Sequence, residues 1–222
     1  MKEIEEKKQN KMLKFLKENK RWFLSIIALI LFIFILEDVL EQEIYRFDET
    51  IYSFISKGIS DNMSQIAKII TTMGSVYVII PVTIISIIYF WKKRESKYIV
   101  INLAIIFASN QILKRIIARP RPDEFRIVEE TGYSFPSGHS MISMAFYGLF
   151  IYLIYKKINN KYLKWTLIIL LSILIILIGV SRIYLGVHYA SDVCAGFLLS
   201  IAYIIAFTHF ISKEDKNKIE LS

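Results

Sequence analysis

Long apolar stretches, separated by short charged segments, constrain this chain more than any other feature of its sequence. They cover roughly residues 22–40, 66–91, 98–117, 137–155, 164–180 and 190–211. Each is close to the ~20 residues that an α-helix needs to cross about 30 Å of hydrocarbon. Of the 222 residues, 55% are apolar, which is rare in soluble domains. The pattern predicts an all-α fold, an integral membrane bundle of six transmembrane helices.

The segments outside these stretches are short, so residues 1–222 are expected to form one membrane-embedded domain. A basic segment, 1–21, precedes the first stretch. No small-residue cleavage pattern follows it, so we expect the first stretch to be kept as a span rather than removed as a signal peptide. Pro81 is expected to kink the second span.

The segment 41–60, between the first two stretches, has a helical pattern of its own. Ile44, Phe47, Ile51 and Phe54 recur at three- and four-residue spacing, with charged residues among them. This predicts an amphipathic helix at the membrane interface. Two roles fit the pattern equally well, a lid packed on the bundle and an element that admits lipid.

The distribution of basic residues predicts the orientation of the bundle. The net charge of +8 could suggest nucleic acid binding, but most Lys and Arg lie between the apolar stretches, where they set orientation. Nineteen of the 28 collect at alternate ends, so those ends and both termini are predicted to be cytoplasmic. Six of the other nine crowd into two segments on the extracytoplasmic side: Lys114, Arg115, Arg119, Arg121, Arg126 and Arg182. That concentration needs a reason other than topology.

The first of three polar clusters runs from Lys114 to Pro122. X-Pro pairs disfavour helix, so the third span should end near Ala118, with Lys114 on its last turn and Arg121 on a stiff loop. The two cations could converge on one anion. Anchoring to lipid headgroups explains this cluster equally well when it is taken alone.

The second cluster is Pro136-Ser137-Gly138-His139, where a loop turns into the fourth span. Ser137 is a favoured N-cap residue, and a helix N-terminus presents free N–H groups and a positive dipole end to an anion. Gly138 keeps the backbone approachable. A simple cap would explain the serine but not the adjacent His139.

The third cluster is Ser181-Arg182, followed by His188 and Asp192. If the sixth span begins near His188, the four-residue interval puts imidazole and carboxylate on one helix face. Asp192 would then orient the ring so that its other nitrogen can attack phosphorus, while Arg182 offers a planar fork to phosphate oxygens. A His–Asp pair that only satisfies itself is one alternative. A metal site is another, which the nearby cations disfavour.

Taken together, the three clusters resemble the signature of the type-2 phosphatidic acid phosphatase superfamily in spacing and in order. The resemblance implies a hydrolase in which His188 is the nucleophile, Asp192 its orienting partner and His139 the acid. It also implies a phosphate-binding group, without metal or cofactor, made of Lys114, Arg121, Ser137, Gly138 and Arg182. Arg115 and Arg119 lie outside the signature and could contact either substrate or headgroups.

The short loops resemble small bacterial members of the superfamily that act on phosphatidylglycerol phosphate or undecaprenyl diphosphate. We therefore expect a multi-pass enzyme of a bacterial plasma membrane that releases phosphate from a lipid on the extracytoplasmic side, through phosphohistidine. The expected partners are the lipid phosphate and the bilayer, with no nucleic acid. Three alternatives stay open: a broad phosphatase for phosphatidic acid or other lipid phosphates, a non-catalytic phosphate-lipid binding or transport protein, and a metal-dependent hydrolase.

Overall fold

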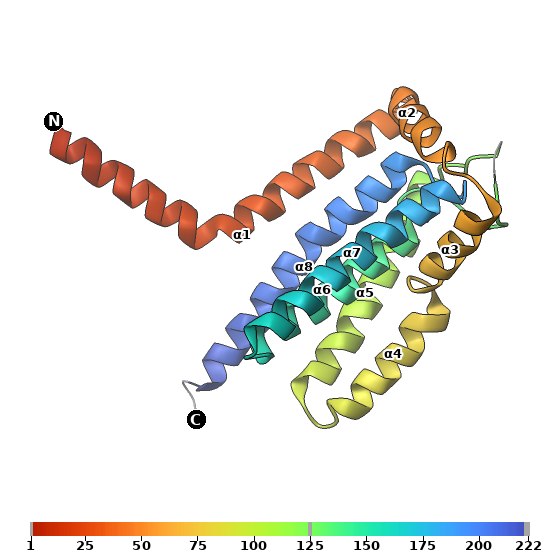
Figure 1. Cartoon of the computed structure of the whole chain (residues 1–222). Helices are drawn as coiled ribbons and strands as arrows, with labels where there is room; N and C mark the ends of the chain where they lie inside the picture. Colours follow the sequence, from red (N-terminus) through yellow and green to blue (C-terminus); the bar gives the residue numbers. More distant parts are fainter. Residues whose placement is uncertain (1, 124–125, 220–222) are drawn as a thin grey trace.

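The computed structural model describes the backbone of residues 2–123 and 126–219, and the side chains of 19–123 and 126–214. The regular elements among the described residues are helices, without strands, and Figure 1 shows them as a bundle with a short helix across its end. This confirms the all-α prediction. The helices are α1 (Lys2–Leu40), α2 (Tyr45–Ser56), α3 (Asp61–Thr72), α4 (Val76–Tyr89), α5 (Arg94–Ile117), α6 (Gly138–Lys157), α7 (Lys161–Tyr184) and α8 (Ala190–Ile219).

The predicted number of spans is confirmed. Among the described residues, six segments are long and apolar enough to cross a membrane: Asn19–Leu40, Asp61–Tyr89, Arg94–Ile117, Gly138–Lys157, Lys161–Tyr184 and Ala190–Glu214. Large apolar side chains such as Ile27, Ile85 and Ile169 are exposed along them, as a lipid-facing surface requires. Because six is even, the outer ends of the first and last spans lie on the same side of a bilayer that all six cross.

The second span consists of two helices, α3 and α4, which meet at residues 73–75. Pro81 lies inside α4, so the interruption comes before the proline that was expected to kink this span. Gly74 lies at the interruption, where a Cβ atom would come within 2.8 Å of Ile178 Cγ2 and 3.2 Å of the His139 ring. The break therefore brings bare backbone against α6 and α7.

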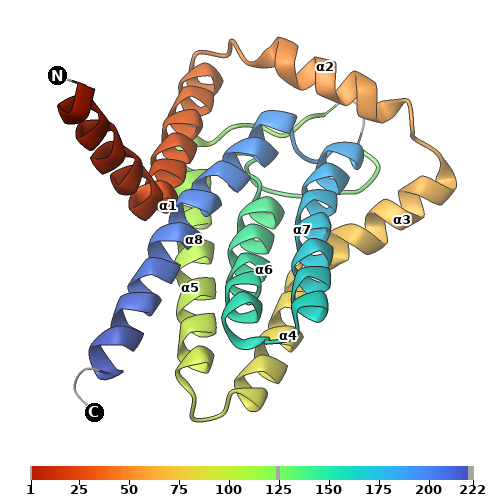
Figure 2. The same cartoon turned by 60° about the vertical axis from the view of Figure 1, so that its left-hand side comes forward.

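Helix α6 lies at the centre of the bundle and packs against α5, α7 and α8. The core around it includes the fully buried side chains of Ile99, Phe146, Leu149 and Ile178. Helix α1 runs along α8, and α3 runs along α7. Helix α2 and the loops that precede α6 and α8 gather at one end of the bundle (Figure 2), and this end contains the candidate site.

The helix predicted within 41–60 is present as α2, but it buries an acidic side chain as well as apolar ones. Ile51 and Ile55 pack against the bundle, while Phe47 and Phe54 are exposed. Asp48, which the pattern assigns to the polar side, is only 4% exposed. The position of α2 at a membrane interface stays a prediction.

Candidate active site

The first two predicted clusters are joined by the loop between α5 and α6. Helix α5 ends at Ile117, and Ala118 follows with a left-handed φ of 49°, as the prediction of a helix end near Ala118 requires. Ser137 is the N-cap of α6, and its Oγ accepts the Ser140 N–H at 3.4 Å, as predicted. The Ser137 N–H donates to the Asp192 carbonyl oxygen at 3.0 Å, which ties this loop to α8.

His188 and Asp192 form the expected pair, with Nδ1 and Oδ2 3.3 Å apart. Helix α8 begins at Ala190, as the apolar stretch 190–211 predicts, so His188 lies in the turn before the helix rather than on its first turn. The pair forms because the Asp192 carboxylate reaches back from the first helical turn. Its Oδ2 also accepts the Tyr189 N–H at 2.9 Å and the Ser134 hydroxyl, which fixes that carboxylate.

The hydrogen bonds around His188 define its tautomer. Arg121 Nη1 lies 3.1 Å from His188 Nε2, and a guanidinium can only donate. This assigns the lone pair to Nε2 and the proton to Nδ1, which donates to Asp192. Burial lowers the pKa of His188 to about 4, so the ring is neutral at neutral pH. A neutral, oriented imidazole with one unprotonated nitrogen is a competent nucleophile.

Arg121 and Arg182 face a carboxylate that was not predicted from the sequence. Glu130 Oε2 lies 2.6 Å from Arg182 Nη2, and its Oε1 lies 4.0 Å from Arg121 Nη2. Burial alone would raise the pKa of Glu130, but Arg182 and Arg121 lower it overall, so the group stays ionised. Glu130 therefore occupies the fork where the oxygens of an anionic ligand would bind.

Nη1 and Nη2 of Arg182 are hydrogen-bonded in the described structure, whereas Nε is not. Its Nη1 donates to Thr71 Oγ1 at 2.9 Å, but its buried Nε–H has no acceptor among the residues that the structure describes. A buried donor without a partner costs about 1–3 kcal/mol, so this N–H is suited to a ligand oxygen. Lys114 lies on the last turn of α5, as predicted, and its ammonium donates to the carbonyls of Tyr133 and Ser134.

The remaining predicted residues open α6. Gly138 packs so closely on Asn110 that a Cβ atom would come within 3.0 Å of the amide oxygen. His139 follows, beside Gly74, and its ring lies in the electric field of the cations Arg182, Arg121 and Lys114. In the described part of the chain, no hydrogen bond joins His139 to the other predicted residues. All eight predicted residues thus lie at one end of the bundle.

A cavity of about 360 Å³ opens beside His188, between α2 and the loops that precede α6 and α8. Its lining includes Tyr45, Asp48, Tyr52, Arg121, His188 and Tyr189. Within the described ranges, no three His, Cys, Asp or Glu side chains are grouped so that they could hold a metal ion. The lining of the cavity holds one cation, the Arg121 guanidinium, together with three carboxylates and the neutral His188 imidazole.

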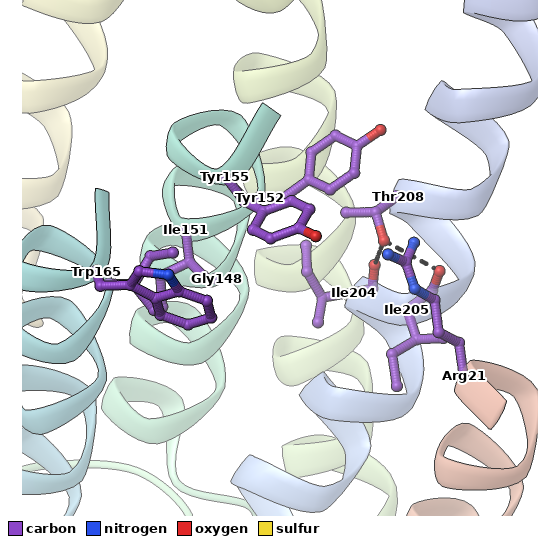
Figure 3. A pocket seen from close by; sticks show the side chains of 10 residues that line it. Arg21, Gly148, Ile151, Tyr152, Tyr155, Trp165, Ile204, Ile205 and Thr208 are labelled. Carbon is purple, nitrogen blue, oxygen red and sulfur yellow. Dashed lines mark hydrogen bonds between the residues drawn. The ribbon is translucent and has the colours of Figure 1, made fainter. Parts of the chain in front are cut away.

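A second groove, of about 290 Å³, lies toward the opposite end of the bundle (Figure 3). It is lined mainly by apolar and aromatic side chains of α6, α7 and α8, such as Ile151, Trp165 and Ile204, with Arg21 of α1 at its side. Neither histidine nor carboxylate lines it, in contrast to the cavity beside His188.

Comparisons with known proteins agree with this geometry. The sequence profile of the PAP2 superfamily matches residues 96–216, which include every predicted site residue. Phosphatidylglycerophosphatase B of Bacillus subtilis is 31% identical over 159 residues, which cover 68% of this chain and 76% of that protein. The undecaprenyl-diphosphatase of Sulfolobus acidocaldarius is 30% identical over 184 residues, 80% of this chain and 84% of the other.

The fold is also similar to that of a solved structure. The crystal structure of a transmembrane PAP2 type phosphatidylglycerolphosphate phosphatase from Bacillus subtilis superposes with a TM-score of 0.80 at 25% identity. The match covers 86% of this chain and 97% of that one. The six-span arrangement therefore extends over nearly all of the matched protein.

Proposed function

This chain belongs to the PAP2 superfamily of membrane lipid phosphatases, and from this premise we propose that it removes a terminal phosphate from a lipid through a phosphohistidine at His188. Phosphatidylglycerol phosphate and undecaprenyl diphosphate are the proposed substrates, in keeping with the names of two relatives. The observation that carries the proposal is the buried His188 ring, whose Nδ1 faces Asp192 and whose Nε2 faces the Arg121 guanidinium at the cavity.

The proposed reaction has two steps. His188 Nε2 attacks phosphorus, the P–N bond forms as the bond to the leaving oxygen breaks, and His139 gives that oxygen its proton. Asp192 stabilises the positive charge that His188 acquires. The neutral His139 then takes a proton from water, the water oxygen attacks phosphorus, and the P–N bond breaks to release inorganic phosphate.

Phosphate binding begins with displacement of a resident carboxylate. The substrate phosphate takes the position of Glu130 between Arg182 and Arg121, and one of its oxygens accepts the free Arg182 Nε–H. As Arg121 turns to phosphate, it releases His188 Nε2 for attack. Lys114, Ser137 and the Gly138 N–H at the start of α6 complete the cradle.

The site is proposed to face the extracytoplasmic side of a bacterial plasma membrane, with both termini cytoplasmic. The asymmetric distribution of Lys and Arg supports this orientation. A fluorescent protein that folds only in the cytoplasm, fused after residue 222, should be bright. If the fusion protein inserts normally into the membrane but is dark, the orientation is opposite to the one proposed.

The reaction is tested with purified protein and a panel of phosphatidylglycerol phosphate, undecaprenyl diphosphate and phosphatidic acid. His188→Ala should reduce phosphate release by at least about 10³-fold. His209→Ala is the matched control, because His209 packs edge-on against Trp22, away from the predicted site residues, and should keep its activity. Full activity of His188→Ala would refute the proposal. Loss of wild-type activity in EDTA would favour a metal-dependent hydrolase, and binding of the lipids without phosphate release would favour a binding or transport protein.

A further inference from the structure

Two arginines in the segment Arg119-Pro120-Arg121-Pro122 contact the two members of the histidine–aspartate pair. Arg121 contacts His188, and Arg119 donates to Asp192 Oδ1 at 2.7 Å. We propose that Arg119 is a positioning residue for the His188–Asp192 pair, and that Asp48 holds it in place, so that the pair works only while α2 is docked. The inference rests on the proposed function of His188.

Arg119 bridges two buried carboxylates. Its Nη1 bonds Asp192, and its Nη2 bonds Asp48 Oδ2 at 2.8 Å. The exposed fractions of the three side chains are 14% for Arg119, 4% for Asp48 and 0% for Asp192. Burial alone would lower the pKa of Arg119, but the two carboxylates raise it overall. Removing one member of such a group leaves a buried charge without its partner, so the three side chains act as a unit.

Asp48 links this unit to α2. Its Oδ1 accepts the Ser191 N–H and its Oδ2 accepts the Ser191 hydroxyl, both at 2.8 Å. These contacts fasten α2 to the first turn of α8, one residue before Asp192. Ile51 and Ile55 pack beside them, but apolar packing alone would not require a buried acid on this helix.

The consequence for catalysis is positional and electrostatic. Asp192 directs Oδ2 at His188 while Oδ1 is held by Arg119, so the carboxylate has little freedom to rotate. The Arg119 guanidinium also stacks over the Tyr189 ring at 4.1 Å, next to His188. Its positive charge partly offsets the negative charge of Asp192. Without it, Asp192 would favour the protonated imidazole more strongly and the nucleophile would be harder to keep neutral.

The test compares Arg119→Lys and Asp48→Asn with wild type. Lysine keeps the charge but cannot bridge two carboxylates with one planar fork. Arg119→Lys should lower kcat by roughly tenfold to 100-fold while KM changes little. The acid limb of kcat/KM should move to higher pH, because a lysine that no longer bonds Asp192 Oδ1 offsets less of the carboxylate charge that His188 meets. Asp48→Asn should lower kcat and shift the acid limb in the same directions, but by less. The kcat of the double variant should be no lower than that of Arg119→Lys.

Arg115→Lys is the matched control, because Arg115 is exposed on the last turn of α5. It should match wild type in kcat, KM and pH profile. The pH readout needs this control because other charged groups also face the pair, namely Lys114, Arg121, Glu130, His139 and Arg182. Those groups are unchanged in every variant of the series.

Two results would overturn the inference. If Arg119→Lys and Asp48→Asn lower only the unfolding temperature, and kcat and the acid limb stay as in wild type, Arg119 is a structural brace. Wild-type behaviour of both variants in every measurement would exclude any role. Failure of the proposed function is separate, because a fully active His188→Ala variant refutes the nucleophile whatever Arg119 does. Imidazole ¹⁵N shifts of the substrate-free protein still test whether Arg119 acts on His188.

Discussion

The two ends of the bundle hold their cations in different ways. At the catalytic end, Arg121 and Arg182 are buried, at 8% and 2% exposure, and bond to carboxylates, carbonyls and a hydroxyl. At the other end, Lys156 and Lys164 lie over tyrosine rings at 5.0 and 5.5 Å, and Lys157 pairs with Glu95 while 45% exposed. Exposed cations of this kind suit headgroup anchoring.

This difference distinguishes two explanations for the cations, ligand binding and membrane orientation. A count of charges cannot distinguish them. A cation at a membrane interface costs little while it can reach water or headgroups. Burial removes that option, so each buried cation needs partners and a reason to be retained. The burial of the arginines at the catalytic end therefore supports the proposed phosphate-binding role, while the lysines of the other end suit orientation.

The largest expected effect contrasts one cation from each end. Arg182→Ala should lower kcat/KM by about 10²–10³-fold, because it removes the donors that meet charge in the transition state. Arg182→Lys should recover only part of this loss, since the fork is missing. Lys164→Ala, measured in the same lipid vesicles, should stay within about twofold. Comparable losses at both ends would remove the distinction between them.

The next effect is on pH dependence. Because burial lowers the pKa of His188 to about 4, the nucleophile is neutral above that pH and becomes protonated below it. Activity should therefore be kept from neutral pH down toward pH 5, apart from the titration of the substrate itself. It should fall about tenfold per unit below pH 4. The chain has three histidines, so ¹⁵N spectra of labelled protein can follow the His188 ring directly. A ring that titrates near 6.5 would show that burial is incomplete.

A pair of glycines extends the comparison to packing. Gly74→Ala would place its Cβ 2.8 Å from Ile178 and 3.2 Å from His139, so we expect a loss of about 1–3 kcal/mol in the free energy of unfolding. We also expect roughly a tenfold drop in kcat, as His139 is displaced. Gly148→Ala, in the groove at the other end, meets Ile204 at an ordinary 3.6 Å. It should stabilise the helix by up to about 1 kcal/mol without changing kcat. Thermal unfolding and phosphate release measure both.

The smallest expected effect concerns Glu130. Glu130→Gln removes the charge that competes with substrate phosphate for Arg182 and Arg121, so KM and the inhibition constant of inorganic phosphate should both decrease. A change of about threefold corresponds to a partly exposed ion pair worth less than 1 kcal/mol. Steady-state assays with added phosphate measure both constants. A higher KM would instead mean that Glu130 orients the arginines for the substrate.

The parts of the fold that depend on local pattern could be predicted from the sequence. Hydropathy located the six spans, and local backbone rules located the helix end at Ala118 and the cap at Ser137. The His188–Asp192 pair was also predicted, and it forms although His188 lies in the turn before α8, because a four-residue interval also suits that turn.

The contacts that complete the site depend on long-range packing, and the sequence carried no signal for them. Asp48 bonds Ser191 across 143 positions and Arg119 across 71. In an amphipathic pattern, Asp48 is indistinguishable from an acid that faces water. Glu130 lies in a loop without periodicity, and only the proximity of Ile178 and His139 explains the requirement for Gly74.

The backbone bond from Ser137 to Asp192 has a consequence for the order in which the protein is made. Synthesis proceeds from the N-terminus, so the loop that precedes α6 is made well before α8. Helix α8 is the last helix and contains Asp192. Until that helix inserts, the loop lacks this bond to α8 and His188 lacks the Asp192 carboxylate. Under the proposed mechanism, a nascent chain therefore cannot cleave a lipid phosphate before its final span inserts.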